Sequence, residues 1–108
     1  MKKTEYFFLQ VLFVSFLVLA GGCSKNAADT SSLYTPTSAN VTANATLQEL
    51  QQGRALYISN CNSCHALVSP DNYIPAQWKS VLTTMAPRTS MSTSEILLVT
   101  KYLSKGQQ

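Results

Sequence analysis

Residues 60–65 read NCNSCH and carry the pattern Cys-x-x-Cys-His, which constrains the rest of the chain more than any other stretch does. Cys61 and Cys64 lie one helical turn apart, so both thiols can add to the two vinyl groups of one porphyrin. His65 follows at once and can bind the porphyrin iron from the same side. The pattern therefore predicts one haem c per chain, attached through Cys61 and Cys64, with His65 as the proximal iron ligand.

Other uses of the same residues fit the sequence less well. A structural zinc ion needs four ligands, and the chain offers no second pair of ligands beside Cys61, Cys64 and His65. A thioredoxin-like redox pair needs a βαβ context, which the sequence does not show. A plain disulfide between the two cysteines would leave His65 without a role.

Helix signals on both sides of the motif predict an all-α domain of about three helices over residues 46–108. Two capping boxes and one proline mark the helix starts, and a glycine marks the last helix end. The domain is small enough that its own apolar core is marginal, and a haem would add a large apolar body to it. The expected helices run from Leu47 to about Asn60 after Thr46, from Ala76 to about Met85 after Pro75, and from the capping box Ser92–Glu95 to Gly106.

Apolar side chains recur at helical spacing in each of these segments, which predicts their inward faces. Gly53 interrupts the first helix at a cost of about 1 kcal/mol relative to Ala. A glycine inside a helix often lets another backbone approach closely. The predicted inward residues are Leu50, Tyr57, Trp78, Val81, Leu82, Ile96, Val99, Tyr102 and Leu103.

The pattern Gly53-x-x-x-Tyr57-x-x-x-Cys61-x-x-Cys64-His65, together with a final Tyr102-Leu103, resembles the class I c-type cytochromes. The likeness covers residues 46–108. In that family the first and last helices cross, with a glycine and an aromatic side chain at the crossing. The resemblance implies these two places for Gly53 and Tyr102, and it implies a small cytochrome c-like fold.

The sixth iron ligand has to come from another residue type. His65 is the only histidine of the chain, so bis-histidine ligation within one molecule is excluded. A methionine thioether is the usual partner in such haems. We expect Met85, because Met91 directly precedes a capping box and should pack back onto Ile96. Met91, a lysine, a tyrosine or a vacant position remain the alternatives.

Two further residues are expected near the haem. The run from Pro75 to Trp78 resembles the segment whose proline carbonyl accepts the Nδ1–H of the proximal histidine, which implies that role for Pro75 toward His65. The alternative is that Pro75 only begins a helix. Trp78 is expected either to donate its indole N–H to a haem propionate or to form the main apolar wall of the core.

Residues 1–22 predict an export signal. Lys2 and Lys3 give a positive start, and an apolar run then extends from Tyr6 to Ala20. This run has 15 residues, whereas a membrane-spanning helix needs about 20. An uncleaved membrane anchor is therefore the weaker interpretation.

The end of this segment, LAGGC at residues 19–23, resembles the lipobox of bacterial lipoproteins. In that family the cysteine is acylated and becomes the first residue of the mature protein. Cys23 is also the one cysteine that the haem motif leaves unused. We therefore expect lipid on Cys23 and attachment to a membrane through that lipid.

Residues 23–45 are rich in Ser, Thr, Asn and Ala and show no apolar period, which predicts a flexible tether after the acylated cysteine. The 22 residues after Cys23 would hold the domain about 25 Å from its anchor on average. The cytochrome domain proper is then expected over residues 46–108.

Charge and composition narrow the range of functions. The chain after residue 22 has six basic and four acidic side chains, and no basic stripe that would indicate nucleic acid binding. We expect a mono-haem c-type cytochrome, not itself an enzyme, that exchanges electrons with redox partner proteins. The export signal places it on the periplasmic or cell-surface side of a bacterial membrane. The alternatives are a haem-based ligand binder or sensor, and a cytochrome subunit of a larger oxidoreductase complex.

Overall fold

The computed structural model describes residues 27–107, so the predicted signal segment and Cys23 lie outside the described residues. Within this range there is no β-strand, only an isolated bridge between Thr42 and Ala45. The predicted all-α fold with three main helices is confirmed, and α2 and α3 agree with their expected bounds within one residue. The elements are η1 (Ser38–Asn40), α2 (Leu47–Cys61), η2 (Pro70–Asn72), α3 (Pro75–Met85), η3 (Ala86–Arg88) and α4 (Thr93–Leu103).

Both predicted capping boxes are present. The Thr46 hydroxyl accepts the Glu49 N–H at 3.2 Å, and the Thr46 N–H donates to the Glu49 carboxylate at 2.9 Å. Ser92 and Glu95 make the same exchange at the start of α4, at 3.3 and 2.7 Å. Each box satisfies N–H groups that the first turn of a helix leaves without partners.

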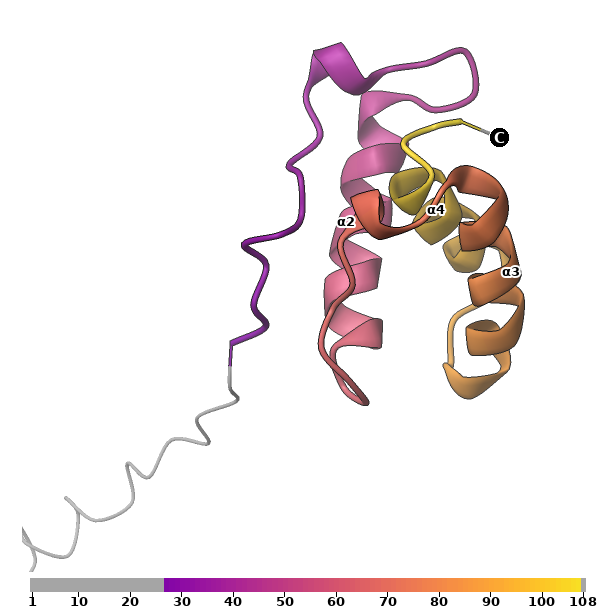
Figure 1. Cartoon of the computed structure of the whole chain (residues 1–108). Coiled ribbons are helices and arrows are strands. Elements are labelled where there is room, and N and C mark those ends of the chain that lie inside the picture. Colours follow the sequence, from indigo (N-terminus) through magenta and orange to yellow (C-terminus); the bar gives the residue numbers. More distant parts are fainter. Residues whose placement is uncertain (1–26, 108) are drawn as a thin grey trace, which may run out of the picture.

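Helix α4 packs between α2 and α3 and crosses α2 at Gly53 (Figure 1). A Cβ atom at Gly53 would lie 2.1 Å from the Leu98 carbonyl oxygen and 2.8 Å from the Tyr102 Cβ. No side chain fits at such distances, so the glycine permits the close approach of the two helices. This confirms the places that the resemblance implied for Gly53 and Tyr102.

The core forms where these helices meet. Leu50, Val99 and Tyr102 have no exposed surface, and Leu103 has 1%. Of the predicted inward residues, only Val81 and Ile96 are half-buried rather than buried. The main core cluster consists of Leu33, Tyr57, Trp78, Leu82, Val99, Tyr102 and Leu103.

Helix α4 ends at Leu103, three residues before the predicted Gly106, and Gly106 lies in the turn that follows it. Lys105 and Gly106 have positive φ angles of 52° and 69°, and the Gly106 N–H donates to the Lys101 carbonyl at 2.8 Å. A Cβ on Gly106 would also lie 2.5 Å from the Thr42 hydroxyl. Both the left-handed turn and this contact therefore require glycine.

Residues 33–45, here called the N-terminal strap, differ from the flexible tether expected over residues 23–45. Leu33 is 7% exposed and belongs to the core. The Tyr34 ring stacks on the Tyr102 ring, with 4.7 Å between centroids. The Tyr34 hydroxyl donates to the Tyr102 carbonyl at 2.8 Å, and the Tyr102 hydroxyl donates to the Tyr34 carbonyl at 3.0 Å. These contacts offset the entropy cost of ordering the segment, which its polar composition alone would not offset.

Further hydrogen bonds hold the strap and the residue before it. The Arg54 Nε–H donates to the Tyr34 carbonyl at 3.1 Å, and the Thr42 hydroxyl donates to the Gly106 carbonyl at 3.0 Å. The Ser69 hydroxyl donates to the Ser32 carbonyl at 3.0 Å. The strap is thus part of the folded domain along its length.

None of the helices between residues 27 and 107 has the length and apolar character needed to cross a bilayer.

Candidate haem site

The Cys-x-x-Cys-His motif lies at the C-terminal end of α2. Cys61 is the last residue of the helix and is half-buried, whereas Cys64 and His65 are exposed in the turn that follows. Both thiols are free. Burial raises the pKa of the Cys61 thiol, and the neighbouring Cys64 adds to this effect. Among residues 27–107, no three His, Cys, Asp or Glu side chains converge on a common metal position.

An open cavity of about 370 Å³ brings the motif together with residues from the rest of the domain. Cys61, Cys64 and His65 line it, and Met85 lines it from the end of α3, 20 positions after His65 in the sequence. The remaining walls are mostly apolar. They include Tyr57, Val68, Tyr73, Trp78, Val81, Leu82 and Leu103.

These residues fit a c-type haem. The cavity volume lies within the range of cofactor sites, about 300–1,000 Å³, and its apolar walls suit the faces of a porphyrin. Two thiols and one imidazole occur together on its lining, with a thioether also present. Arg88 is an exposed cation on the lining, where it can meet a haem propionate.

The two candidate methionines lie in different surroundings. Met85 lines the cavity that contains His65. Met91 is half-buried, packs against the main core cluster and is not part of the cavity lining. This placement favours Met85 as the residue that could bind the iron opposite His65.

Of the two roles expected for each of Pro75 and Trp78, the structure shows the second: Pro75 begins a helix, and Trp78 is an apolar wall. The Trp78 indole N–H donates to the Pro70 carbonyl at 2.9 Å, and the side chain is 2% exposed. Its donor is therefore used within the protein, and Trp78 acts as a buried wall of the cavity instead of a propionate donor. Pro75 begins α3 and lines a different cavity, while His65 Nδ1 lies 2.8 Å from the Ala66 carbonyl oxygen.

Tyr57 has a role at this site that its sequence position did not reveal. Its hydroxyl donates to the Val68 carbonyl and accepts the Val68 N–H, both at 2.9 Å. This pair of bonds closes the loop that contains Cys64 and His65 and fixes its return to α2. The available signal was a buried tyrosine one turn before Cys61, because a buried phenol needs a hydrogen-bond partner. Burial also raises the pKa of Tyr57.

Comparison with known proteins gives one informative similarity. No family model matches the sequence, and no solved structure matches it. A stretch of 56 residues is 38% identical to the cytochrome c-type protein TorY of Haemophilus influenzae. The stretch covers 52% of this chain and 15% of TorY, so the chain spans only a small part of the relative's length. Together with the all-helical fold, this similarity supports a c-type cytochrome.

Proposed function

We propose that this protein is an exported mono-haem c-type cytochrome that exchanges electrons with redox partner proteins at the outer face of a bacterial membrane. The observation that carries the proposal is that Cys61, Cys64, His65 and Met85 all line the same cavity. These four side chains have the donor set that covalent attachment and six-coordinate iron require.

Each side chain of the cavity has a distinct task in this function. A haem supplies reversible one-electron chemistry when bound. Cys61 and Cys64 would hold it covalently, and His65 and Met85 would provide the two axial ligands. Leu82, like the other apolar walls, would keep water from the porphyrin face. With His65 and Met85 as ligands, a bound haem would have no open position for substrate chemistry.

Attachment to a membrane through Cys23 is part of the proposal. It is supported by the lipobox-like sequence and by the absence of another role for this thiol. Leu33 is the first buried residue of the described chain, so nine residues separate Cys23 from the packed domain. Such a segment spans at most about 35 Å. The domain would therefore stay close to the membrane surface. Mass spectrometry of the N-terminal peptide tests this, and an unmodified Cys23 would contradict it.

The haem itself is tested with protein purified from cells that can attach haem. Acid–acetone extraction should leave one haem per chain on the protein, and Cys61→Ser and Cys64→Ser should each weaken the attachment. The reduced protein should not bind carbon monoxide. Release of all haem from the unaltered protein would overturn the proposal. Carbon monoxide binding would favour the ligand binder or sensor.

A second candidate is a cytochrome subunit of a larger oxidoreductase complex. The observation that favours it is that the similar stretch forms only 15% of TorY, so a related segment occurs there within a much longer chain. Co-purification from the native membrane distinguishes the two, since a free carrier should elute alone under conditions that preserve complexes.

A further inference from the structure

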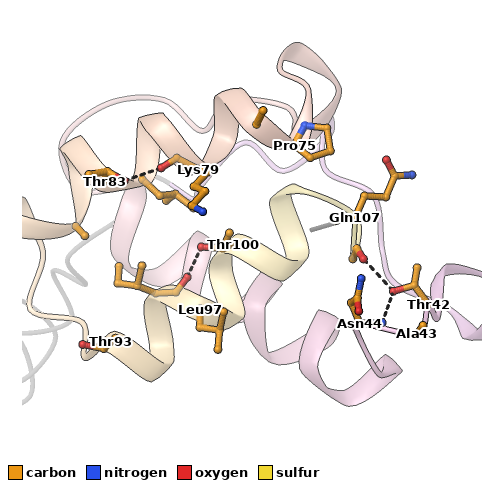
Figure 2. Close-up of a pocket in the computed structure, with 15 residues that line it drawn as sticks. Thr42, Ala43, Asn44, Pro75, Lys79, Thr83, Thr93, Leu97, Thr100 and Gln107 are labelled. Atoms are coloured by element: carbon orange, nitrogen blue, oxygen red, sulfur yellow. Dashed lines mark hydrogen bonds between the residues drawn. The ribbon is translucent and has the colours of Figure 1, made fainter.

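A second, larger depression lies on the other side of α3. It is an open groove of about 1,030 Å³ between α3, α4 and residues 42–44 (Figure 2). Its walls are mainly apolar or uncharged, with Leu82 on α3, Ala86 at the start of η3, and Ile96 and Leu97 on α4. The proposed electron carrier has no evident use for this groove.

One exposed apolar side chain lies on the wall of this groove. Large hydrophobic residues that are clearly exposed in the described chain are Val41, Tyr73, Ile74 and Leu97. Leu97 is 49% exposed and lines the groove. Val41 and Ile74, 48% and 63% exposed, each directly precede a lining residue. An open groove with mainly apolar or uncharged walls and an exposed leucine marks an interaction surface more often than a free surface.

The groove carries one charge. Lys79 is the only charged residue on its lining, and Figure 2 shows its side chain projecting from α3 toward α4. The two ion pairs found among residues 27–107 join Lys101 to Glu49 and Lys105 to Asp71, so neither of them uses Lys79. An apolar wall with an unpaired ammonium group is complementary to an apolar segment that carries a carboxylate.

The groove also adjoins the candidate haem site. Leu82 is 5% exposed and lines both the groove and the cavity that contains Cys61 and His65. A molecule seated in the groove would therefore be separated from the haem cavity by the thickness of one side chain. Such a separation suits electron exchange with the occupant.

We propose that the groove between α3 and α4 is the docking surface for a redox protein that presents an apolar helix or loop with a carboxylate opposite Lys79. The inference rests on the proposed electron-carrier function and deepens it by naming the partner's chemistry. A protein occupant is favoured because the groove adjoins the candidate haem site, from which the proposed function has electrons pass to redox partner proteins. A lipid and a second copy of this chain are the competing occupants.

The first test uses the haem-loaded full chain in its native host, with a photo-cross-linking amino acid at position 97. The matched control carries the same group at Thr84, an exposed residue of α3 that lines neither depression. Position 97 should link to one protein of different sequence that has its own redox centre, at a yield about tenfold above position 84. Linkage to lipid, linkage to a second copy, or equal yields at the two positions would overturn the proposal.

The second test uses that cross-linked protein in purified form and measures the rate of electron transfer between the two at low ionic strength. Lys79→Gln and Thr84→Glu change the net charge by the same amount. Lys79→Gln should lower the rate about tenfold, while Thr84→Glu should change it little, and Lys79→Arg should restore it. High salt should remove the difference, because it screens the ammonium group. Equal rates for Lys79→Gln and Thr84→Glu would refute the docking site.

Failure of the docking site is distinguishable from failure of the proposed function. Each variant's haem spectrum and reduction by a small-molecule reductant report on the haem site alone. Normal haem behaviour without any dependence on Lys79 would remove the docking site and leave the electron carrier intact. A chain that attaches no haem would remove the proposed function itself.

Discussion

The two halves of α2 lie in opposite surroundings. Near its start, Leu50 has no exposed surface, and Gly53 contacts α4 so closely that a Cβ would overlap the Leu98 carbonyl. At its end, Cys61 borders an open cavity of about 370 Å³, and Cys64 and His65 beyond it are exposed. Protein atoms alone fill the first region. The second has apolar walls but no side chain that fills it, which is the form expected of a site shaped for a prosthetic group.

This contrast predicts how stability is divided in the domain. A small domain buries little apolar surface when it folds. In this domain the helices approach each other very closely where α2 and α4 cross at Gly53. Some cavity walls, Tyr73 and Val81 among them, are exposed or half-buried in the protein alone and would gain their full burial only when a large apolar group covers them. Substitutions in the two regions should therefore have different effects on stability and on the haem, which four experiments can measure.

The largest effect is expected from preventing haem attachment. The double variant Cys61→Ala/Cys64→Ala should show little cooperative unfolding by circular dichroism, because the cavity walls lose the body that covers them. Ser63→Ala, at the exposed position between them, is the control and should melt as the parent does. A sharp transition in the double variant at the parent's temperature would show that the helix crossing suffices for folding.

Gly53→Ala tests the crossing itself. The new methyl group would overlap the Leu98 carbonyl oxygen, so the free energy of unfolding of the haem-loaded protein should fall by about 2–3 kcal/mol in denaturant titrations. Gln52→Ala, exposed on the same helix, should change it by no more than about 0.5 kcal/mol. If Gly53→Ala instead stabilises the protein by about 1 kcal/mol, as helix propensity alone predicts, the close approach is wrong.

Substitution of Met85, which lines the cavity, should have different effects from substitution of Met91, which packs against the core. Met85→Ala should lower the reduction potential, abolish the weak iron–thioether charge-transfer band and admit carbon monoxide, because an axial ligand is lost. Met91→Ala should keep the spectrum and cost about 2 kcal/mol of stability, the low end for a core methionine that is half-buried. A band that survives in Met85→Ala and vanishes in Met91→Ala would reverse the assignment.

The smallest effect concerns the cap of α2. Hydrogen bonding to Lys101, and then to Thr46, lowers the pKa of Glu49 from 4.5 to about 2. A carboxyl group whose pKa is lower in the folded state stabilises the protein above its unfolded pKa and loses this contribution as the pH falls. The free energy of unfolding should therefore decrease between about pH 5 and pH 2.

Glu49→Gln is the variant that isolates this group. It can keep the capping box, since glutamine also accepts the Thr46 N–H, but it loses the charge that faces Lys101. Its stability should depend less on pH in that range. An unchanged slope would assign the pH dependence to other carboxyl groups, such as Glu95, whose pKa is lowered by hydrogen bonds from Ser92.

The sequence could predict those features that depend on neighbours along the chain. Helix starts follow from capping boxes and from Pro75, and the end of α4 follows from Gly106, because the groups involved are within a few residues of one another. The Cys-x-x-Cys-His pattern is equally local, so its two thiols and imidazole could be placed on one helix end. Gly53 was also informative, because a helix accepts the cost of glycine when another backbone must come close.

Only the tertiary structure decided which distant groups meet. It placed Met85 on the lining of the cavity that contains His65. It also showed that the Trp78 indole N–H donates to the Pro70 carbonyl and that the Tyr57 hydroxyl donates to the Val68 carbonyl. It also folded the polar strap against α4 through the Tyr34–Tyr102 stack. The physical reason is that these contacts join segments whose separation in sequence carries no periodic signal. The composition and spacing of a segment indicate which of its side chains can be buried. The packing of the helices, of α2 against α4 above all, determines which groups those buried side chains contact.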